Sequence, residues 1–516
     1  MSNSIPCCQS KILALGTAFL LNACSPTVNW NFERTPSTTF AEPQATSVGA
    51  LFQEAVDRHP GLSGFDLIRE GDRAFMARLA MADLAEKSLD AQYYIWDGDT
   101  TGKILAGHLM RAADRGVRVR VLIDDNYRTQ ETDFAMAVLD AHPNIEIRFF
   151  NPVTNRGWRW ASFAGDFSRV NHRMHNKLFV MDNAVGIVGG RNIGDVYFGV
   201  RADHNYRDLD VLTVGPIANE LSASFDLFWN SEWAVPAGAV VASQPSEPEL
   251  RDAMQRLEAQ VAATSYPYPI YEKVTDLQAR LVALRDRLVW APGRVLVENP
   301  SRVSTADHGV IRAALAERVD AVQHELLIES PYFVLGETAI ERVQGLTARG
   351  ATVRALTNSA ISNDVLPAHA GYANTRKALL RAGMELYELR PDSNMKRQWS
   401  ILAGSAGASL HTKSLVFDRQ AVFIGSFNLD PRSTTINTEI GVLIDSPELA
   451  GQVGELMDEG VTSGSAYRVT LDADGDLVWA TETDGKAVEY HRDPGTTVWQ
   501  RFVVGVVRLL PIEDQL

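Results

Sequence analysis

Cysteine is nearly absent from this chain. Only three of the 516 residues are cysteine, and Cys7, Cys8 and Cys24 all lie in the first 24 positions. If this segment is removed by cleavage before Cys24, the remaining chain has no pair of thiols and cannot form a disulfide. A fold that depends on a disulfide framework is therefore excluded.

Positive charge is also scarce. The chain has 49 Lys and Arg residues against 64 Asp and Glu, a formal net charge of −15 and a pI near 5.3. Proteins that bind nucleic acid in general need an excess of basic residues to neutralise phosphates, so we expect no nucleic-acid partner. With 45% hydrophobic residues, the chain is long enough for two domain-sized cores.

Long hydrophobic runs are missing as well. The N-terminal run from Ile12 to Leu21 has about ten mostly apolar residues, too few for a spanning helix but typical of a signal peptide. It leads into Leu21-Asn22-Ala23-Cys24, which resembles a bacterial lipobox. We therefore expect a signal peptide over 1–24, lipidation of Cys24 and a Ser/Thr/Pro-rich linker over 25–50. The alternative is a cytoplasmic protein with an amphipathic N-terminus.

No group of residues has the spacing of metal ligands. Asp472, Asp474 and Asp476 resemble the start of a calcium loop, but the Glu that an EF-hand requires is missing, since Glu482 has the wrong spacing. This segment is predicted to be a hairpin turn. We expect neither a metal nor another cofactor.

A five-residue pattern occurs twice with identical spacing. Each copy has His, Lys two positions later, Asp five positions after the Lys, and then a Gly-containing phrase that ends in Asn. A chance match is expected at roughly one starting position in millions, so the pair is not a coincidence. The two copies comprise His175, Lys177, Asp182 and Asn192, and His411, Lys413, Asp418 and Asn428.

The pattern suits chemistry at a phosphate group. In an extended chain positions i and i+2 share a face, so each His is presented together with its Lys. If the two copies meet, one imidazole can attack phosphorus while the other gives a proton to the leaving alcohol. The two Lys charges and the Asn amides then stabilise the charge on the phosphoryl oxygens, and no metal is needed.

The duplication extends beyond the motif. The strand-like run 89–96, Arg115-Gly116 and the run 117–123 recur as 327–334, Arg349-Gly350 and 351–356, close to the 236-residue offset between the two motif histidines. Each half reads strand, helix, strand and then a hairpin with the motif. This order predicts two pseudo-symmetric α/β sandwich halves with one active site at their interface.

The doubled motif resembles that of the phospholipase D superfamily, and more closely that of bacterial C-type cardiolipin synthases. The resemblance is carried by 89–96 (LDAQYYIW), 173–177 (RMHNK), 189–198 (GGRNIGDVYF) and 425–433 (GSFNLDPRS), and it runs from about residue 50 to the end. It implies an acidic residue behind each catalytic His, here Asp208 and Glu439, which would orient the imidazole. Asp210 is an alternative to Asp208. Asp182 and Asp418 belong to the catalytic motif, although a role in capping backbone donors at a strand end is the simpler interpretation.

The resemblance implies transfer of a phosphatidyl group through a phosphohistidine. His175 would attack and His411 would act as acid and then as base, although the near symmetry makes this assignment reversible. Cardiolipin synthesis from phosphatidylglycerol and a second phospholipid is the expected reaction. A hydrolytic phospholipase D, which releases phosphatidic acid, and a metal-independent nuclease remain alternatives, because access of water to the same intermediate decides the outcome.

The predicted organisation has a first half over 51–238, a helical connection over 239–295, a second half over 296–460 and a C-terminal region over 461–516. In the last region, 498–511 reads as an amphipathic helix that lies either at a membrane interface or against the core. Phospholipids and a membrane surface are the expected partners. We expect a lipid-anchored protein on the periplasmic side, or alternatively one on the cytoplasmic face of the inner membrane.

Overall fold

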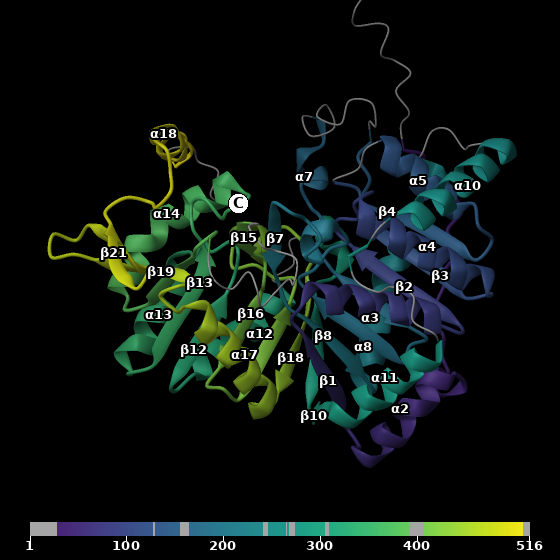
Figure 1. Cartoon of the computed structure of the whole chain (residues 1–516), viewed down its shortest axis with the longest axis horizontal. Helices are drawn as coiled ribbons and strands as arrows, with labels where there is room; N and C mark the ends of the chain where they lie inside the picture. Colours follow the sequence, from purple (N-terminus) through teal and green to yellow (C-terminus); the bar gives the residue numbers. More distant parts are fainter. Residues whose placement is uncertain are drawn as a thin grey trace, which may run out of the picture.

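The computed structural model shows two α/β halves side by side (Figure 1). The residues that the structure describes are 28–126, 130–154, 165–240, 246–264, 266–267, 274–304, 309–392 and 407–508. Each half is built on one large mixed sheet, of nine strands in the first and ten in the second. The predicted fold class, two α/β halves, is confirmed.

The first sheet has the strand order β10-β1-β8-β6-β5-β2-β3-β4-β9. Strands β2, β3 and β4 are parallel, as expected for strands joined through helices, and the remaining pairs are antiparallel. The strands are β1 (Ser63–Ile68), β2 (Ser88–Tyr93), β3 (Arg118–Asp124), β4 (Ile145–Phe150), β5 (Leu178–Met181), β6 (Val185–Gly189), β8 (Asp210–Val214), β9 (Ala234–Pro236) and β10 (Val289–Ala291).

The second sheet has the order β11-β18-β17-β16-β12-β13-β14-β19-β20-β21. Its strands β12, β13, β16, β17 and β18 repeat the arrangement of β2, β3, β5, β6 and β8. The strands are β11 (Gly293–Val297), β12 (Glu325–Glu329), β13 (Thr352–Asn358), β14 (Glu385–Leu389), β16 (Ser414–Phe417), β17 (Ala421–Gly425), β18 (Ile440–Asp445), β19 (Ala466–Leu471), β20 (Leu477–Thr483) and β21 (Lys486–Tyr490).

The helices cover both faces of the sheets (Figure 1). In the first half and the connection they are η1 (Pro43–Ala45), α2 (Ser47–Arg58), α3 (Gly71–Leu84), α4 (Thr100–Asp114), α5 (Gln130–Asp140), α7 (Phe167–Val170), η2 (Asp195–Tyr197), α8 (Pro216–Trp229), α9 (Ala237–Val240), α10 (Glu247–Ala263) and α11 (Val274–Arg287). In the second half they are η3 (Pro300–Val303), α12 (Val310–Ala321), α13 (Glu337–Ala348), α14 (Leu366–Arg381), α16 (Pro431–Thr435), α17 (Pro447–Gly460) and α18 (Val498–Val507).

The repeated Arg-Gly pairs end equivalent helices. Gly116 follows α4 with φ +91°, and Gly350 follows α13 with φ +89°, a conformation that glycine adopts without the steric cost of a Cβ. In both cases the glycine N–H and the next N–H donate to carbonyls of the last helical turn, which is the Schellman pattern. The same local chemistry therefore turns the chain into β3 and β13.

The two halves share a hydrophobic core. Apolar side chains of α8 and α17, such as Phe225 and Val453, pack with those of β6, β17 and β18, so one face of each sheet contributes to a single central cluster. Two further clusters fill the outer sides of the first and second sheets. Because the central core belongs to both sheets, the halves are held in a fixed relation.

The connection between the halves contributes a strand to each sheet. The region 239–295, predicted to be helical, contains α10 and α11 and then β10, which pairs with β1 of the first sheet. After Pro292 the chain enters β11, which pairs with β18 of the second sheet. The region after 460 adds β19 to β21 to the second sheet, and Asp472–Asp476 forms the predicted hairpin turn between β19 and β20.

Two short strands join the halves next to the motifs. Strand β7 (His204–Arg207) of the first half pairs in parallel with β15 (Gly407–Leu410), which leads into His411. On the other side Met174, before His175, forms a parallel bridge with Thr438. The backbone before each motif histidine is thus attached to the opposite half. In the described part of the chain, no helix has the length and apolar character required to cross a membrane.

Candidate active site

The two motif histidines lie where strands of both halves meet. The backbone N–H of His175 donates to the carbonyl of Thr438 at 2.9 Å, and that of His411 donates to the carbonyl of Arg207 at 2.7 Å. Each acceptor directly precedes an acidic residue, Glu439 or Asp208. The same interstrand contact therefore places a carboxylate beside each imidazole.

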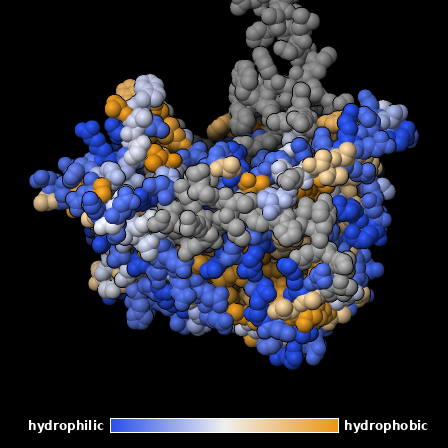
Figure 2. All heavy atoms as spheres, viewed as in Figure 1, coloured by the Kyte–Doolittle hydropathy of each residue, from blue (hydrophilic) through white to orange (hydrophobic). Residues whose placement is uncertain are grey.

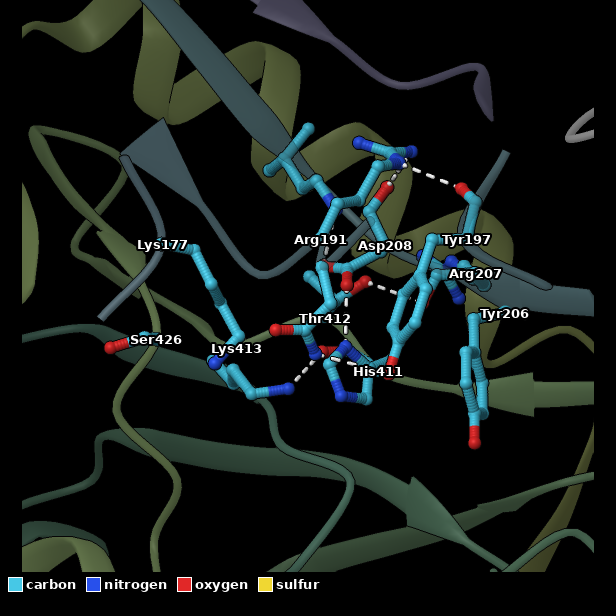
Figure 3. Close-up of polar contacts among 12 residues, drawn as sticks. Lys177, Arg191, Tyr197, Tyr206, Arg207, Asp208, His411, Thr412, Lys413 and Ser426 are labelled. Carbon is cyan, nitrogen blue, oxygen red and sulfur yellow. Dashed lines mark hydrogen bonds and ion pairs between the residues drawn. The ribbon is translucent and has the colours of Figure 1, made fainter. Parts of the chain in front are cut away.

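The carboxylates cross between the halves. Nδ1 of His175 lies 2.8 Å from Oε2 of Glu439. Nδ1 of His411 lies 2.6 Å from Oδ2 of Asp208 (Figure 3). Each acidic residue that follows one motif thus orients the histidine of the other motif. The alternative, Asp210, instead pairs with Arg78 at 3.0 Å and Arg191 at 3.4 Å. With Nδ1 directed at a carboxylate, Nε2 is the ring nitrogen available for chemistry.

Both imidazoles line one cavity of about 500 Å³. The cavity therefore brings together the two residues that the sequence places 236 positions apart. Its other walls come from the ends of strands and from the start of α14. They are formed by Tyr94, Ile95, Asn126, Asn171, Asn192, Tyr197, Tyr332, Asp364, Val365, Pro367, Ala368, Asn428, Asp430, Arg432, Ser433 and Asn437.

The motif lysines are buried next to their histidines. The Nζ of Lys177 donates to the backbone carbonyl of His175 at 2.5 Å. The Nζ of Lys413 donates to the carbonyl of His411 at 2.5 Å (Figure 3). Burial lowers the pKa of Lys177 well below its ordinary value and that of Lys413 to about 8. The positive charge of Lys413 also opposes protonation of Lys177, and nearby carboxylates, including Asp208 and Glu439, partly offset the effect of burial on both lysines.

Burial controls the protonation of the imidazoles too. It lowers the pKa of His175 to about 4, against the opposing effect of Glu439, and the pKa of His411 well below its usual range. The charges of the two lysines act in the same direction as burial. His175 holds the pKa of Glu439 below its usual value, whereas burial raises that of Asp208. A neutral His175 with Nδ1–H directed at Glu439 has an Nε2 lone pair, as a nucleophile requires.

The two motif asparagines both line the cavity but are held differently. Asn192 accepts a hydrogen bond from the backbone of Ile95 at 3.1 Å and donates to the hydroxyl of Tyr197 at 3.0 Å. The Oδ1 of Asn428 is buried and has no hydrogen-bond partner among the described residues. Asn428 therefore presents a polar group to the cavity that a ligand could satisfy.

The motif aspartates lie away from the cavity and bind backbone donors. Asp182 accepts hydrogen bonds of 2.7–2.9 Å from the N–H groups of residues 86, 87 and 88, where the chain enters β2. Asp418 accepts bonds of 2.7–2.9 Å from residues 323, 324 and 325 at the start of β12. The carboxylates thus join the motif hairpin to the neighbouring strand. Both aspartates thus bind backbone donors, as in the capping interpretation. The donors lie at the start of the neighbouring strand, however, and not at the end of the strand that precedes each aspartate.

Sequence reasoning missed a second pair of equivalent residues. Asp124 at the end of β3 accepts a hydrogen bond from the N–H of Met174, and Asn358 at the end of β13 accepts one from Leu410, both at 2.8 Å. Each holds the residue directly before a motif histidine. Both follow strand runs that the repeat analysis had already aligned, so a comparison of the polar residues just after those runs could have found them.

Among the described residues, the other histidines do not contribute to the cavity walls. His369 is buried in the second half, with Nε2 3.7 Å from Asp493, and His172 and His204 are likewise absent from the walls. Within the described ranges, no three His, Cys, Asp or Glu side chains are grouped as metal ligands. Cys24, the basic and aromatic segment 156–160, and residues 509–511 lie outside the described part of the chain.

Comparisons with known proteins agree with the duplicated architecture. Residues 79–229 and 315–460 match the family described as "Cardiolipin synthase, PLD-like domain". Cardiolipin synthase C of Escherichia coli (strain K12) is 37% identical over 470 residues, which cover 88% of this chain and 97% of that protein. Cardiolipin synthase A of Pseudomonas entomophila (strain L48) is 26% identical over 409 residues, or 76% of this chain and 67% of that protein.

A solved structure shares the fold. The phosphatidylserine synthase of Haemophilus influenzae Rd KW20 superposes with a TM-score of 0.57 at 16% sequence identity and covers 90% of this chain and 100% of that chain. Each of the two segments that match the family contains one copy of the His-Lys-Asp motif.

Proposed function

Because this chain belongs to the phospholipase D-like family of cardiolipin synthase domains, we propose that it transfers a phosphatidyl group from one phospholipid to another. The finer proposal is the synthesis of cardiolipin from phosphatidylglycerol and a second phospholipid. It is supported by the likeness to cardiolipin synthase C of Escherichia coli over nearly the whole of both chains.

The observation that carries the mechanism is the pair of imidazoles in one cavity, each bound at Nδ1 to a carboxylate of the other half. In the first step, the Nε2 lone pair of His175 attacks phosphorus. The bond from phosphorus to the headgroup oxygen breaks, and that oxygen takes the proton from Nε2 of protonated His411. The headgroup leaves with a protonated hydroxyl, as a free alcohol, and the phosphatidyl group remains on His175.

In the second step the roles of His411 reverse. Its neutral Nε2 removes the proton from an incoming hydroxyl, whose oxygen attacks phosphorus as the bond from phosphorus to His175 breaks. The enzyme returns to its starting protonation state. The hydroxyl of phosphatidylglycerol gives cardiolipin, whereas water would give phosphatidic acid, so exclusion of water determines which product forms.

Charge in and beside the cavity stabilises the phosphoryl oxygens. Lys177 and Lys413 lie directly beside the two imidazoles, and Asn428 and Arg432 line the wall. An anionic phosphodiester would offset the lysine charges that disfavour protonated His411. Substrate binding is thus expected to raise the pKa of His411 toward the range in which it can act as an acid.

The products of defined lipids test this function. Purified protein is given phosphatidylglycerol alone and together with phosphatidylethanolamine, and the lipids are identified by mass spectrometry. The proposal expects cardiolipin from the wild type, none from His175→Ala, and wild-type yields from His172→Ala, which changes a histidine outside the cavity walls. Phosphatidic acid without cardiolipin would instead identify a hydrolase. DNA cleavage without lipid turnover would indicate a nuclease, which the acidic composition disfavours.

The place of action is part of the proposal. The lipobox-like segment ending at Cys24 supports lipid anchoring on the periplasmic side, with the cytoplasmic face of the inner membrane as the alternative. Helix α18 supports contact with a membrane surface, because none of its residues is buried and Val498, Trp499 and Phe502 are 75%, 68% and 58% exposed. Figure 2 shows hydrophobic atoms gathered in this region at the upper left.

A further inference from the structure

Asp364 is a carboxylate held at the wall of the catalytic cavity by two tyrosines. The hydroxyl of Tyr206 donates to its Oδ2 at 2.7 Å, and the hydroxyl of Tyr332 donates to its Oδ1 at 2.9 Å. Tyr206 belongs to the first half, whereas Tyr332 and Asp364 belong to the second. The side chain is solvent-exposed yet fixed in direction, and both halves contribute to its position.

This group lies on the His411 side of the cavity. The ring of Tyr206 is 5.0 Å and that of Tyr197 is 5.2 Å from the ring of His411, measured between centroids (Figure 3). The Asp364 carboxylate is near enough to favour protonation of His411, since its charge acts to raise the pKa of that imidazole against burial.

The His175 side has different chemistry. There the neighbours are Tyr94, whose ring is 5.0 Å from that of His175, and Ser433, which donates to Glu439 at 2.8 Å. Arg432 directly precedes Ser433 and lines the cavity. Arg432 donates to Oδ1 of Asn171, another residue of the wall, at 2.9 Å. The cavity wall thus includes this cation, whereas the carboxylate of Asp364 lies on the His411 side and would repel a phosphate group.

An in-line displacement fixes which part of the substrate meets the anion. The leaving oxygen lies opposite the nucleophile, so with His175 attacking, the headgroup extends toward His411 and Asp364. Each carboxylate oxygen has about two acceptor positions, and here each already accepts one tyrosine hydroxyl. The remaining positions suit a hydroxyl or an ammonium group on the headgroup.

We propose that Asp364, held by Tyr206 and Tyr332, binds the headgroup of the phospholipid and selects headgroups that carry a hydrogen-bond donor, either a hydroxyl or an ammonium. This inference rests on the proposed phosphatidyl transfer and specifies its substrate class. The departing headgroup and the incoming alcohol lie in turn on the same side of phosphorus, opposite His175. The carboxylate of Asp364 can therefore bind the first in one step and the second in the next.

The test compares headgroups with and without a donor. The release of headgroup is measured for phosphatidylglycerol, phosphatidylethanolamine and phosphatidylmethanol, whose methyl group has no donor. In the wild type, kcat/KM should be at least about tenfold higher for the first two lipids, which corresponds to one charge-assisted hydrogen bond of about 1.4 kcal/mol or more. Asp364→Ala should bring the three values within about twofold of one another, through a higher KM for the two donors. All three lipids should share a lower kcat, because the charge that favours protonation of His411 is lost.

A second variant distinguishes the two donor groups. Asp364→Asn keeps an acceptor oxygen but loses the charge. A selective loss for phosphatidylethanolamine would assign the site to an ammonium, and equal retention of both lipids would assign it to neutral hydrogen bonding. Asp203→Ala, which removes an exposed carboxylate from the loop before β7, is the matched control and should change none of the three values.

The inference is overturned if Asp364→Ala lowers kcat/KM equally for all three lipids, as a structural role would, or if it changes none of them. Failure of the proposed function gives another result, since the wild type would then turn over no phospholipid in the series. That outcome would remove both proposals, whereas an active enzyme with unaltered headgroup selection removes only this one.

Discussion

At the scale of single residues, the active site depends on two carboxylates that each bind the catalytic histidine of the opposite half. Glu439 binds His175 and also accepts hydrogen bonds from Ser426 at 2.5 Å and Ser433 at 2.8 Å, so its position is fixed from several sides. Asp208 binds His411 and accepts the N–H of Leu209 at 2.8 Å. Neither half alone therefore contains a complete histidine–carboxylate pair.

Asp430 gives a prediction for the pH dependence of stability. It is buried at the cavity, and burial raises its pKa to about 7. Between its unfolded value near 4 and about 7, the carboxyl is ionised in the unfolded chain but protonated in the folded one, so its contribution to stability is lost as pH rises through this window. Asp430→Asn should remove this loss, and its amide oxygen can still accept the N–H of Ser433.

The measurement is the difference in free energy of unfolding between Asp430→Asn and wild type, from urea denaturation at several pH values. The variant should gain stability relative to wild type from pH 4 to 7, by a few kcal/mol at about 1.4 kcal/mol per pKa unit, and the gain should then level off. A difference that is constant with pH would show that Asp430 is ionised in the folded protein.

The motif residues could be predicted from sequence because both copies keep their types and spacing. Asp364 could not, since nothing marks it before the fold brings Tyr206 and Tyr332 to it. The crossing of Asp208 and Glu439 was equally inaccessible. Their distance from each motif in sequence suggests a partner in the same half. The pairing of β7 with β15 brings Asp208 to His411 instead, and the bridge between Met174 and Thr438 brings Glu439 to His175.

At the scale of elements, the motif aspartates join a hairpin to the start of a neighbouring strand. Asp182 is fully buried, whereas Asp418 is only partly so. Removal of either leaves three backbone donors without this acceptor, but water can reach those released by Asp418 more easily. Asp182→Ala should therefore cost about 2–4 kcal/mol of stability and Asp418→Ala about 1 kcal/mol.

Urea denaturation of the two variants gives these costs. Neither carboxylate lines the cavity, so the folded fraction of each variant should keep kcat within a few-fold of wild type. An equal loss of stability in the two variants would contradict the prediction that the more deeply buried Asp182 contributes more. A loss of kcat by orders of magnitude in fully folded protein would instead assign the aspartates a direct part in the reaction.

A difference between the two motif copies is explained by the carboxylates. Position 190 is Gly where the second copy has Ser426, and a Cβ at Gly190 would overlap the carboxylate of Asp208.

Gly190→Ala should displace Asp208 from His411 and lower kcat about 100-fold, which is the effect expected from a 1 Å misplacement of a catalytic group. Gly451→Ala in α17, where a Cβ meets no neighbour, is the control and should retain wild-type kcat. Wild-type activity of Gly190→Ala would show that Asp208 does not orient the imidazole.

The element order was predictable because hydrophobic periodicity and repeated Arg-Gly turns are local signals. Gly116 and Gly350 end helices in both halves, as their positive φ requires. The assignment of β10 and β11 to different sheets was not predictable, since both are short and only tertiary pairing on either side of Pro292 separates them.

At the scale of the whole molecule, the central core keeps the motifs at fixed separation. Side chains of α8 and α17 contribute to this core from opposite halves. The connection between the halves also adds one strand to each sheet, since β10 pairs with β1 and β11 pairs with β18. A pair of imidazoles 236 residues apart can thus be preorganised without substrate, as electrostatic stabilisation of a transition state requires.

Helix α18 gives a prediction for membrane contact. Arg508 donates to Asn374 of α14 at 2.7 Å and fixes the helix there, while Trp499, Phe502 and Val506 form an exposed apolar stripe. Trp499→Ser with Phe502→Ser should lower activity on phospholipid vesicles at least about tenfold, because burial of the two rings in lipid is lost. Activity on soluble short-chain phospholipids should be unchanged.

The matched control is Leu227→Ser in α8, which removes an apolar side chain that is 44% exposed elsewhere on the molecule. It should leave both activities at wild-type values. Equal vesicle activity of the α18 variant and wild type would show that the stripe does not contact lipid. An altered oligomeric state in sedimentation would show that the stripe is covered by a second copy of the chain.

The division of labour between the two histidines is tested most directly with phosphatidyl-p-nitrophenol, whose leaving group departs without a proton. His411→Ala should release about one equivalent of p-nitrophenolate in a burst and accumulate a phosphatidyl group on His175, because attack needs only His175 while the second step needs a base. His175→Ala should give neither burst nor adduct. A burst from His175→Ala, or none from His411→Ala, would contradict the assignment of His175 as the nucleophile.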